Sequence, residues 1–314
     1  MVASGRRKAN DEFRRGQTIA LWFETLRPRQ WVKNLFVFLP LVFAKYLDES
    51  GRVLDAFLAF VSFSAASGAV YVLNDLRDLE ADRRHPTKKQ RPLASGRLAQ
   101  RDAKWLLGGV VILALGLGLL VDVLSGGRFF TLVVLGYLLL NVAYSGGLKR
   151  VAYVDVACIA AGFLLRVSGG AMAVSVHPTG WLLTSTALLA GYLGLGKRAH
   201  ELKLLGDRAA EHRPVLAQYR PLHVSWAMAV LGSITVVGYI VYTTTAHTRA
   251  FFRTDRLVWT VPFAAYGLFR FWQLVVDDRR QDSPTDAMLR DAPFLVNIVL
   301  WGLSIVVVIY GFSR

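Results

Sequence analysis

The sequence predicts an all-α integral membrane protein folded as a bundle of transmembrane helices. Of its 314 residues, 54% are hydrophobic and only 19% are charged, which lies outside the range of ordinary soluble domains. Apolar runs of about 20 residues, the length at which a helix crosses a bilayer, recur along the whole chain. These runs lack the alternation of apolar and polar residues that a transmembrane β-barrel needs. We therefore expect a helical membrane protein with no separate soluble domain.

The apolar runs predict nine transmembrane helices. They cover roughly residues 31–48, 53–74, 104–124, 128–146, 152–174, 180–197, 223–244, 257–274 and 293–312. An odd number of spans places the two termini on opposite sides of the membrane. We expect residues 1–30 to form a basic cytoplasmic N-terminal segment and residues 31–314 to form a single transmembrane domain.

Basic residues predict the orientation. Most of the 37 Lys and Arg residues fall in loops on the same side as the N-terminus, and such an excess marks the cytoplasmic side. The N-terminus is therefore expected in the cytoplasm, with the protein a multi-pass component of the cell (inner) membrane. Topology also explains the net charge of +15, so no nucleic-acid partner is required. The one cysteine, Cys158, excludes disulfide pairs within the chain.

Three aspartates follow the second span, in the stretch NDLRDLEAD. On a continuous helix, Asp75, Asp78 and Asp82 would lie on one face, with Asn74 beside them. Carboxylates gathered on one face repel each other unless a cation lies among them, and oxygen ligands without sulfur or imidazole suit Mg²⁺. We interpret these four residues as catalytic and the three aspartates as Mg²⁺ ligands.

The loop after the aspartates is rich in lysine and arginine, including Lys89, Arg91 and Arg97. Mg²⁺ held by a few carboxylates usually completes its shell with water and phosphate oxygens, and these cations are suited to phosphate charge. The stretch therefore predicts a phosphate and metal site at the cytoplasmic face. The alternative, solvated charges in a cytoplasmic loop, explains the basic residues but not the aspartates.

These residues resemble a known family. NDLRDLEAD matches the NDxxDxxxD motif of the UbiA-type intramembrane prenyltransferase superfamily, and RPLASG matches the stretch that commonly follows it. The resemblance covers nearly the whole chain and implies a nine-helix UbiA-type bundle with a cytoplasmic Asp-rich site. Within the superfamily, the chain looks most like decaprenyl-phosphate phosphoribosyltransferases. The segments that carry this likeness are RPRQWVKNLFVFLPLVF, DRRHPTKKQRPLASG and SPTDAMLRD.

The resemblance implies a reaction. It implies Mg²⁺-dependent transfer of 5-phosphoribose from phosphoribosyl pyrophosphate to a polyprenyl phosphate such as decaprenyl phosphate, with release of pyrophosphate. It also implies a role in supplying the arabinose donor for cell-wall arabinan. The runner-up is a prenyltransferase with a polyprenyl diphosphate donor and an aromatic or other small acceptor. A transporter is a non-enzymatic alternative, but the charges cluster at one surface and Arg166 is the clear exception within a span.

The loop after the sixth span bears on the donor. Prenyl-transferring members of the superfamily carry a second aspartate-rich motif there, whereas this chain has GKRAHELKLLGD. The loop keeps Glu201 and Asp207 but adds cations, among them Lys197 and Arg198. Extra cations favour a donor with a second phosphate group and an acceptor that is a lipid phosphate. Lys197, Arg198 and Glu201 are therefore candidates for substrate contact, although topology alone would also explain the cations.

Four further residues are candidates for substrate contact. Tyr144 and Lys149, in the loop YSGGLKR, are expected on the same side of the membrane as the aspartates. Lys33 and Asn34 resemble family site residues, and anchoring at the membrane interface is the alternative. Glycines such as Gly162 permit close helix contacts within the bundle or between subunits, so a homo-oligomer stays open.

Overall fold

The computed structural model describes residues 18–85, 87–127, 129–206, 214–277 and 284–312. The described residues are helical apart from turns and loops, and none of them lies in a strand, which confirms the all-α prediction. The chain divides into two compact units. Unit 1 contains Met1–Leu39, Glu49–Ser145 and Ser168–Val176, and unit 2 contains Pro40–Asp48, Gly146–Val167 and His177–Arg314. The single domain over residues 31–314 stays a prediction, and residues 1–17 of the basic segment lie outside the described residues.

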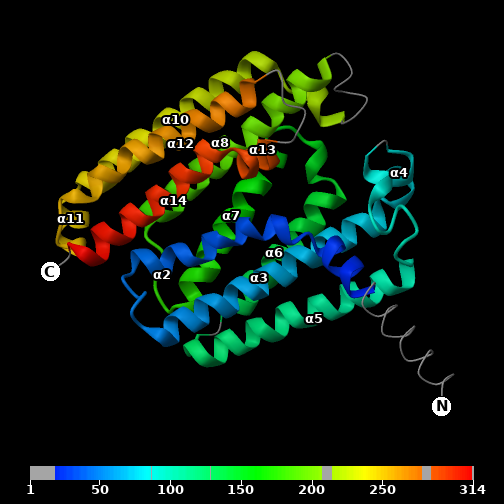
Figure 1. Cartoon of the computed structure of the whole chain (residues 1–314), viewed down its shortest axis with the longest axis horizontal. Helices are drawn as coiled ribbons and strands as arrows, with labels where there is room; N and C mark the ends of the chain where they lie inside the picture. The colour runs from blue at the N-terminus through cyan, green and yellow to red at the C-terminus, as the bar shows by residue number, and fades with distance from the viewer. Residues whose placement is uncertain (1–17, 86, 128, 207–213, 278–283, 313–314) are drawn as a thin grey trace, which may run out of the picture. The chain divides into compact units, whose positions relative to one another are not determined.

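In unit 1, helix α3 (Ser50–Arg77) lies along helix α5 (Gln100–Ser125) and along the 3₁₀ helix η1 (Pro28–Phe38) (Figure 1). The middle of α3 is buried at every position from Ser62 to Val70, and most of these side chains are small. Small residues let helices approach closely where lipid provides no hydrophobic drive. The unit also contains α4 (Leu79–Arg84), η2 (Lys88–Gln90) and most of α6 (Phe130–Gly146).

Unit 2 is built around two pairs of neighbouring helices, α8 with α10 and α12 with α14 (Figure 1). Side chains such as Tyr192, Val224 and Phe271 form a buried apolar core that joins α8, α10 and α12. The elements are η3 (Leu148–Arg150), α8 (Gly180–Leu205), η5 (Pro214–Gln218), α10 (Pro221–Thr244), α11 (Ala246–Phe252), η6 (Arg256–Thr260), α12 (Val261–Val276), α13 (Pro284–Arg290), α14 (Ala292–Val306) and the π-helical η7 (Val307–Gly311). Helix α7 (Val154–Ala173) contributes residues to both units.

Five of the described helices are long and apolar enough to cross a membrane. They are α3, α5, α7, α10 and α14 with η7, and α6 is a shorter apolar helix. Large apolar side chains point outward, as on α5, where Ile112 is 73% and Val123 is 77% exposed. These are the features of a multi-pass membrane protein, since lipid takes the place of a core around such side chains. The count of nine spans and their orientation stay predictions.

The first predicted span is not one α-helix. The 3₁₀ helix η1 runs into the short helix α2 (Leu39–Phe43). Pro40 explains the change, because it has no N–H to donate to the carbonyl of Phe36 as an α-helix requires. The N–H of Leu39 donates to that carbonyl instead. Residues 31–48 are therefore helical in large part, but with tighter winding than we predicted.

Candidate active site

Two aspartates of the NDLRDLEAD stretch converge on one arginine in unit 1. Asp75 in α3 is 2% exposed and Asp82 in α4 is 4% exposed. Nη1 of Arg91 donates to both carboxylates, at 3.1 Å from Oδ1 of Asp75 and 2.5 Å from Oδ2 of Asp82. Nζ of Lys88 lies 3.9 Å from Oδ1 of Asp82. Cations of the following loop therefore neutralise the two buried carboxylates.

A second arginine reaches Asp75 from the N-terminal side. Nη2 of Arg27 lies 2.5 Å from Oδ1 of Asp75, and the guanidinium lies 4.7 Å from the centre of the Tyr71 ring in a cation–π contact. Arg27 has a left-handed backbone with φ of 54°, which non-glycine residues rarely adopt. Pro28 contributes to this, because a proline disfavours the right-handed helical region for the residue before it.

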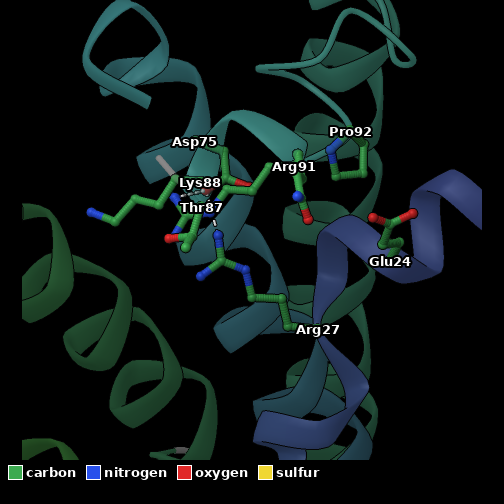
Figure 2. A pocket seen from close by; sticks show the side chains of 8 residues that line it. Glu24, Arg27, Asp75, Thr87, Lys88, Arg91 and Pro92 are labelled. Atoms are coloured by element: carbon green, nitrogen blue, oxygen red, sulfur yellow. Dashed lines mark hydrogen bonds and ion pairs between the residues drawn. The ribbon is translucent and has the colours of Figure 1, made fainter. Parts of the chain in front are cut away.

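These charged groups line a pocket of about 340 Å³ in unit 1 (Figure 2). Arg27 and Arg91 reach Asp75 from two segments, the N-terminal segment and the loop after α4, whereas Lys88 pairs with Asp82. The lining contains more cations than carboxylates, which suits a phosphate-bearing ligand. The other lining residues are Glu24, Thr87, Gln90 and Pro92.

The helix that carries the aspartates is interrupted at Asp78. Helix α3 ends at Arg77 and α4 begins at Leu79, with Asp78 between them at φ −94° and ψ 12°. The assumption of one continuous helix is therefore wrong, because a ψ near zero turns the chain out of the α-helical direction. Within the part of the chain that the structure describes, no group of three or more His, Cys, Asp and Glu side chains is placed to hold a metal ion.

The residues in the pocket nevertheless fit Mg²⁺. The oxygens of Asp75 and Asp82 approach a common point, which is marked by Nη1 of Arg91. Mg²⁺ is usually bound by one or two carboxylates, with water and substrate phosphates in its remaining positions. Asp75 lines the pocket and shares Arg91 with Asp82, so these two carboxylates meet that requirement. Whether Asp78 joins them as a third ligand stays a prediction.

Arg97 lies at the edge of this pocket. It forms a two-pronged pair with Glu24, at 2.9 and 2.7 Å, and donates to the carbonyl of Gln90 at 2.7 Å. The pKa of Arg97 is raised above its usual value, chiefly because Glu24 accepts its hydrogen bonds. Since Glu24 belongs to the helical residues 18–26 and also lines the pocket, the pair ties the N-terminal segment to the residue that directly follows the RPLASG stretch.

Hydroxyl groups hold the two candidate asparagines of unit 1. Oγ of Ser145 donates to Oδ1 of Asn74 at 2.7 Å. Asn34 is fully buried, and its Nδ2 lies 3.1 Å from Oγ of Ser64 and 3.3 Å from Oγ of Ser67. Asn34 therefore links η1 to α3 in this structure.

Three other unit 1 candidates are not among the residues that line the pocket. Lys33 and Tyr144 are partly buried and Lys89 is exposed. The contact of each with substrate stays a prediction.

Unit 2 contains a second cluster of charged groups, and its central pair, Arg198 with Asp155, is sealed from solvent. Arg198 is fully buried, with Nε 2.8 Å from Oδ2 of Asp155 and Nη1 donating to Glu201. The hydroxyl of Tyr219 donates to Oδ1 of Asp155 and accepts from the N–H of Tyr153 at 2.7 Å. Burial, followed by the hydrogen bond to Asp155, raises the pKa of Tyr219 well above its usual range. The phenol is therefore protonated under ordinary conditions and acts as a donor.

The structure thus distributes the predicted unit 2 candidates unevenly. Arg198 and Glu201 belong to this second cluster, whereas Lys149 and Lys197 are partly buried elsewhere on η3 and α8. Asp207 lies outside the described residues.

Sequence reasoning missed the roles of several residues. It did not assign Arg27 or Glu24 to the pocket, and it did not pair Asp155 with Arg198. The side chain of Arg166 donates to the carbonyl of Gly162, one turn earlier in α7. An arginine directly before a proline was the available signal for Arg27, because that position restricts the backbone.

The fold and the pocket define an intramembrane helical protein with a charged pocket built on an aspartate motif. The sequence profile of the UbiA prenyltransferase family matches residues 35–298, and the chain belongs to this family. A UbiA homologue from Archaeoglobus fulgidus, solved with DMAPP and Mg²⁺, has a TM-score of 0.64 at 18% identity, with 92% of this chain and 98% of that chain covered. A homologue from Aeropyrum pernix K1 has a TM-score of 0.66 at 16% identity, with 90% and 98% covered. The fold is therefore the UbiA membrane fold.

Two similar proteins bear a more specific name. The decaprenyl-phosphate phosphoribosyltransferase of Corynebacterium glutamicum is 30% identical over 293 residues, which cover 91% of this chain and 86% of that protein. The decaprenyl-phosphate phosphoribosyltransferase of Mycobacterium tuberculosis is 30% identical over 291 residues, which cover 88% of this chain and 90% of that protein. The resemblance that the motifs predicted is confirmed.

Proposed function

We propose that the protein transfers 5-phosphoribose from phosphoribosyl pyrophosphate to a polyprenyl phosphate, such as decaprenyl phosphate, and releases pyrophosphate. The observation that carries the proposal is the unit 1 pocket, in which Arg27 and Arg91 contact the buried Asp75 and Lys88 also lines the wall. Cations for phosphate beside carboxylates for a metal are what a departing pyrophosphate needs. The names of the two similar transferases support the choice of donor and acceptor.

The pocket suggests how its residues divide the work. Mg²⁺ would be held by Asp75 and Asp82, with Asp78 as the third ligand, and would stabilise the negative charge of the leaving pyrophosphate. Arg27 and Arg91 would bind and orient the donor phosphates. A phosphate oxygen of the lipid attacks the anomeric carbon of the donor while the bond between that carbon and pyrophosphate breaks. Attack from the opposite face gives a product with inverted configuration. The lipid phosphate is already ionised near neutral pH, so no base is required.

The membrane arrangement is part of the proposal. Nine spans would place the N-terminus and the pocket on the cytoplasmic side of the cell (inner) membrane, as the distribution of Lys and Arg supports. The polyprenyl tail would lie against apolar helix surfaces, with each buried CH₂ contributing about 0.8 kcal/mol. The product would feed the synthesis of cell-wall arabinan. A homo-oligomer is compatible with this arrangement and is not required by it.

The remaining candidates would complete the binding of both substrates. We assign Arg198 to position Glu201, because its guanidinium is fully buried against two carboxylates. The residues proposed to contact donor or acceptor are Lys33, Asn34, Lys89, Arg97, Tyr144, Lys149, Lys197 and Glu201.

The proposal is tested by product formation. Purified protein in detergent is incubated with Mg²⁺, radiolabelled phosphoribosyl pyrophosphate and decaprenyl phosphate, and label is counted in the organic phase. We expect Mg²⁺-dependent label that disappears with Asp78→Ala. Glu80→Ala is the matched control, because Glu80 is exposed and pairs with Arg83, so this variant should keep its activity. Full activity of Asp78→Ala would remove that residue from the metal site.

A prenyltransferase with a polyprenyl diphosphate donor is the second candidate. The observation in its favour is that a protein of the same fold is solved with DMAPP, a prenyl diphosphate. The same assay separates the two functions when labelled prenyl diphosphate and an aromatic acceptor replace the labelled donor and lipid. Consumption of the prenyl diphosphate, with no transfer from phosphoribosyl pyrophosphate, would establish this alternative.

A further inference from the structure

Two arginines contact the carboxylates that would hold a metal ion. Nη2 of Arg27 and Nη1 of Arg91 both lie on Oδ1 of Asp75, at 2.5 and 3.1 Å. Nη1 of Arg91 also lies 2.5 Å from Oδ2 of Asp82. Mg²⁺ binds its oxygen ligands at about 2.0–2.1 Å in a nearly octahedral shell. A metal ion on these oxygens and the present guanidinium contacts therefore exclude each other.

Arg27 is the arginine better placed to change partners. Its side chain is 28% exposed and lines the pocket, so its guanidinium can reach a ligand there while the backbone stays in place. Arg91 is shared between Asp75 and Asp82, so its release would break two contacts. The ring of Tyr71 holds the guanidinium of Arg27 beside Asp75, and this contact adds no charge to the pocket.

We infer that Arg27 competes with the metal ion for Asp75 and is drawn away by a phosphate group of the donor. The inference rests on the proposed function, which places metal and phosphate in this pocket. If the phosphate binds the arginine, it frees the carboxylate for the metal. By linkage, metal and phosphate then raise each other's affinity by the same factor. Arg27 thus acts as a positioning residue that favours the loading of metal together with donor.

Metal binding without any reaction tests this inference. Mn²⁺, a spectroscopic substitute for Mg²⁺, is titrated into the purified full-length protein, and free Mn²⁺ is measured by electron paramagnetic resonance. We expect Arg27→Gln to bind Mn²⁺ about tenfold more tightly than the wild type, a typical coupling factor. Arg83→Gln is the control for charge, because Arg83 is exposed and pairs with Glu80. It should bind Mn²⁺ as the wild type does.

A second titration tests the role of phosphate. Ribose 5-phosphate, whose single phosphate group binds Mn²⁺ weakly in solution, is added at saturation. We expect the wild-type affinity for Mn²⁺ to rise about tenfold and that of Arg27→Gln to change little, because the competitor is already absent. An equal rise in both proteins would overturn the inference.

Tyr71→Leu provides a test that keeps every charge. It removes the ring that holds Arg27, and we expect Mn²⁺ affinity to rise about threefold, as the loss of one cation–π contact predicts. If Arg27→Gln does not fold, this variant decides the question. Unchanged or weaker Mn²⁺ binding in a folded variant would overturn the inference even if phosphoribosyl transfer is detected. Tighter binding without any transfer would instead overturn the proposed function alone.

Discussion

The two charged clusters of this protein use the same residue types in different surroundings. In unit 1, Arg27 and Arg91 hold Asp75 at a pocket, and their side chains are 28% and 29% exposed. In unit 2, Arg198 holds Asp155 with both side chains 0% exposed. An arginine that lies at a pocket can exchange its carboxylate for a ligand, whereas the side chain of Arg198 is 0% exposed and is not accessible to one. Burial therefore separates an exchangeable ion pair from a permanent one.

The two kinds of ion pair should differ in what the loss of one partner costs. Removing charge from water is costly, and the attraction between partners offsets that cost only while both are present. Loss of one partner of the sealed pair therefore leaves an uncompensated buried charge and lowers the stability of the fold. In the pocket pairs Asp75 is buried but the arginines keep partial contact with water, so loss of an arginine there should cost less stability and alter binding instead. The predictions below test this difference, beginning with the largest effect.

Arg198→Ala should be the most damaging substitution for stability. It leaves Asp155 buried without its cation, and such a change typically lowers the free energy of unfolding by about 3–5 kcal/mol. The measurement is denaturant unfolding of the purified protein in detergent. Arg97→Ala is the matched control, since its pair with Glu24 is exposed, and its loss should stay below about 1 kcal/mol. Equal effects of the two variants would contradict the distinction between sealed and open pairs.

Tyr219→Phe should have the next largest effect. The substitution removes one hydroxyl that donates to the buried carboxylate of Asp155, and a hydrogen bond to a charged group contributes about 1.5–3 kcal/mol. The same unfolding measurement applies. Tyr153→Phe is the control, because Tyr153 is 46% exposed and should lose less than about 0.5 kcal/mol. A neutral Tyr219→Phe would mean that the other contacts of Asp155, including Arg198 and the N–H of Val156, suffice to stabilise its charge.

Lys88→Gln should affect substrate binding in place of stability. Lys88 lines the pocket and is only loosely paired, with Nζ 3.9 Å from Asp82. Removing one charged contact to a donor phosphate should raise the KM for phosphoribosyl pyrophosphate about tenfold, with kcat little changed. Lys104→Gln, on the exposed side of α5, should leave both constants unchanged. A fall in kcat at constant KM would assign Lys88 to the chemical step.

The sequence predicted the features of this protein that depend on nearby residues. Apolar length predicted the helices, and the nine residues of NDLRDLEAD predicted the family. It could not predict that Arg27 meets Asp75, because the two residues are 48 positions apart and belong to different elements. The pairing of Asp155 with Arg198 was missed for the same reason.

Local irregularities were harder to predict, although one of them carried a signal. Pro40 marks the change from η1 to α2, since it lacks the N–H that a continuous α-helix needs. The break at Asp78 has no glycine or proline beside it. Hydrophobic periodicity reports which face of a helix is buried, and it does not report where a backbone turns. The prediction that three aspartates share one face of a continuous helix was therefore wrong at Asp78, where the helix breaks.

Glu24→Gln should have the smallest effect and tests the rim of the pocket. The exposed pair with Arg97 contributes about 0.2–1 kcal/mol, so stability should fall by no more than that. Glu24 also lines the pocket, where its negative charge opposes phosphate, so the KM for phosphoribosyl pyrophosphate should fall about twofold. Glu49→Gln, which breaks the exposed pair with Arg52 away from the pocket, should not change the KM. A higher KM in Glu24→Gln would instead show that Glu24 matters by positioning Arg97 for the donor. The pair of Glu24 with Arg97 would then take part in donor binding, as the pairs of Asp75 with Arg27 and Arg91 do.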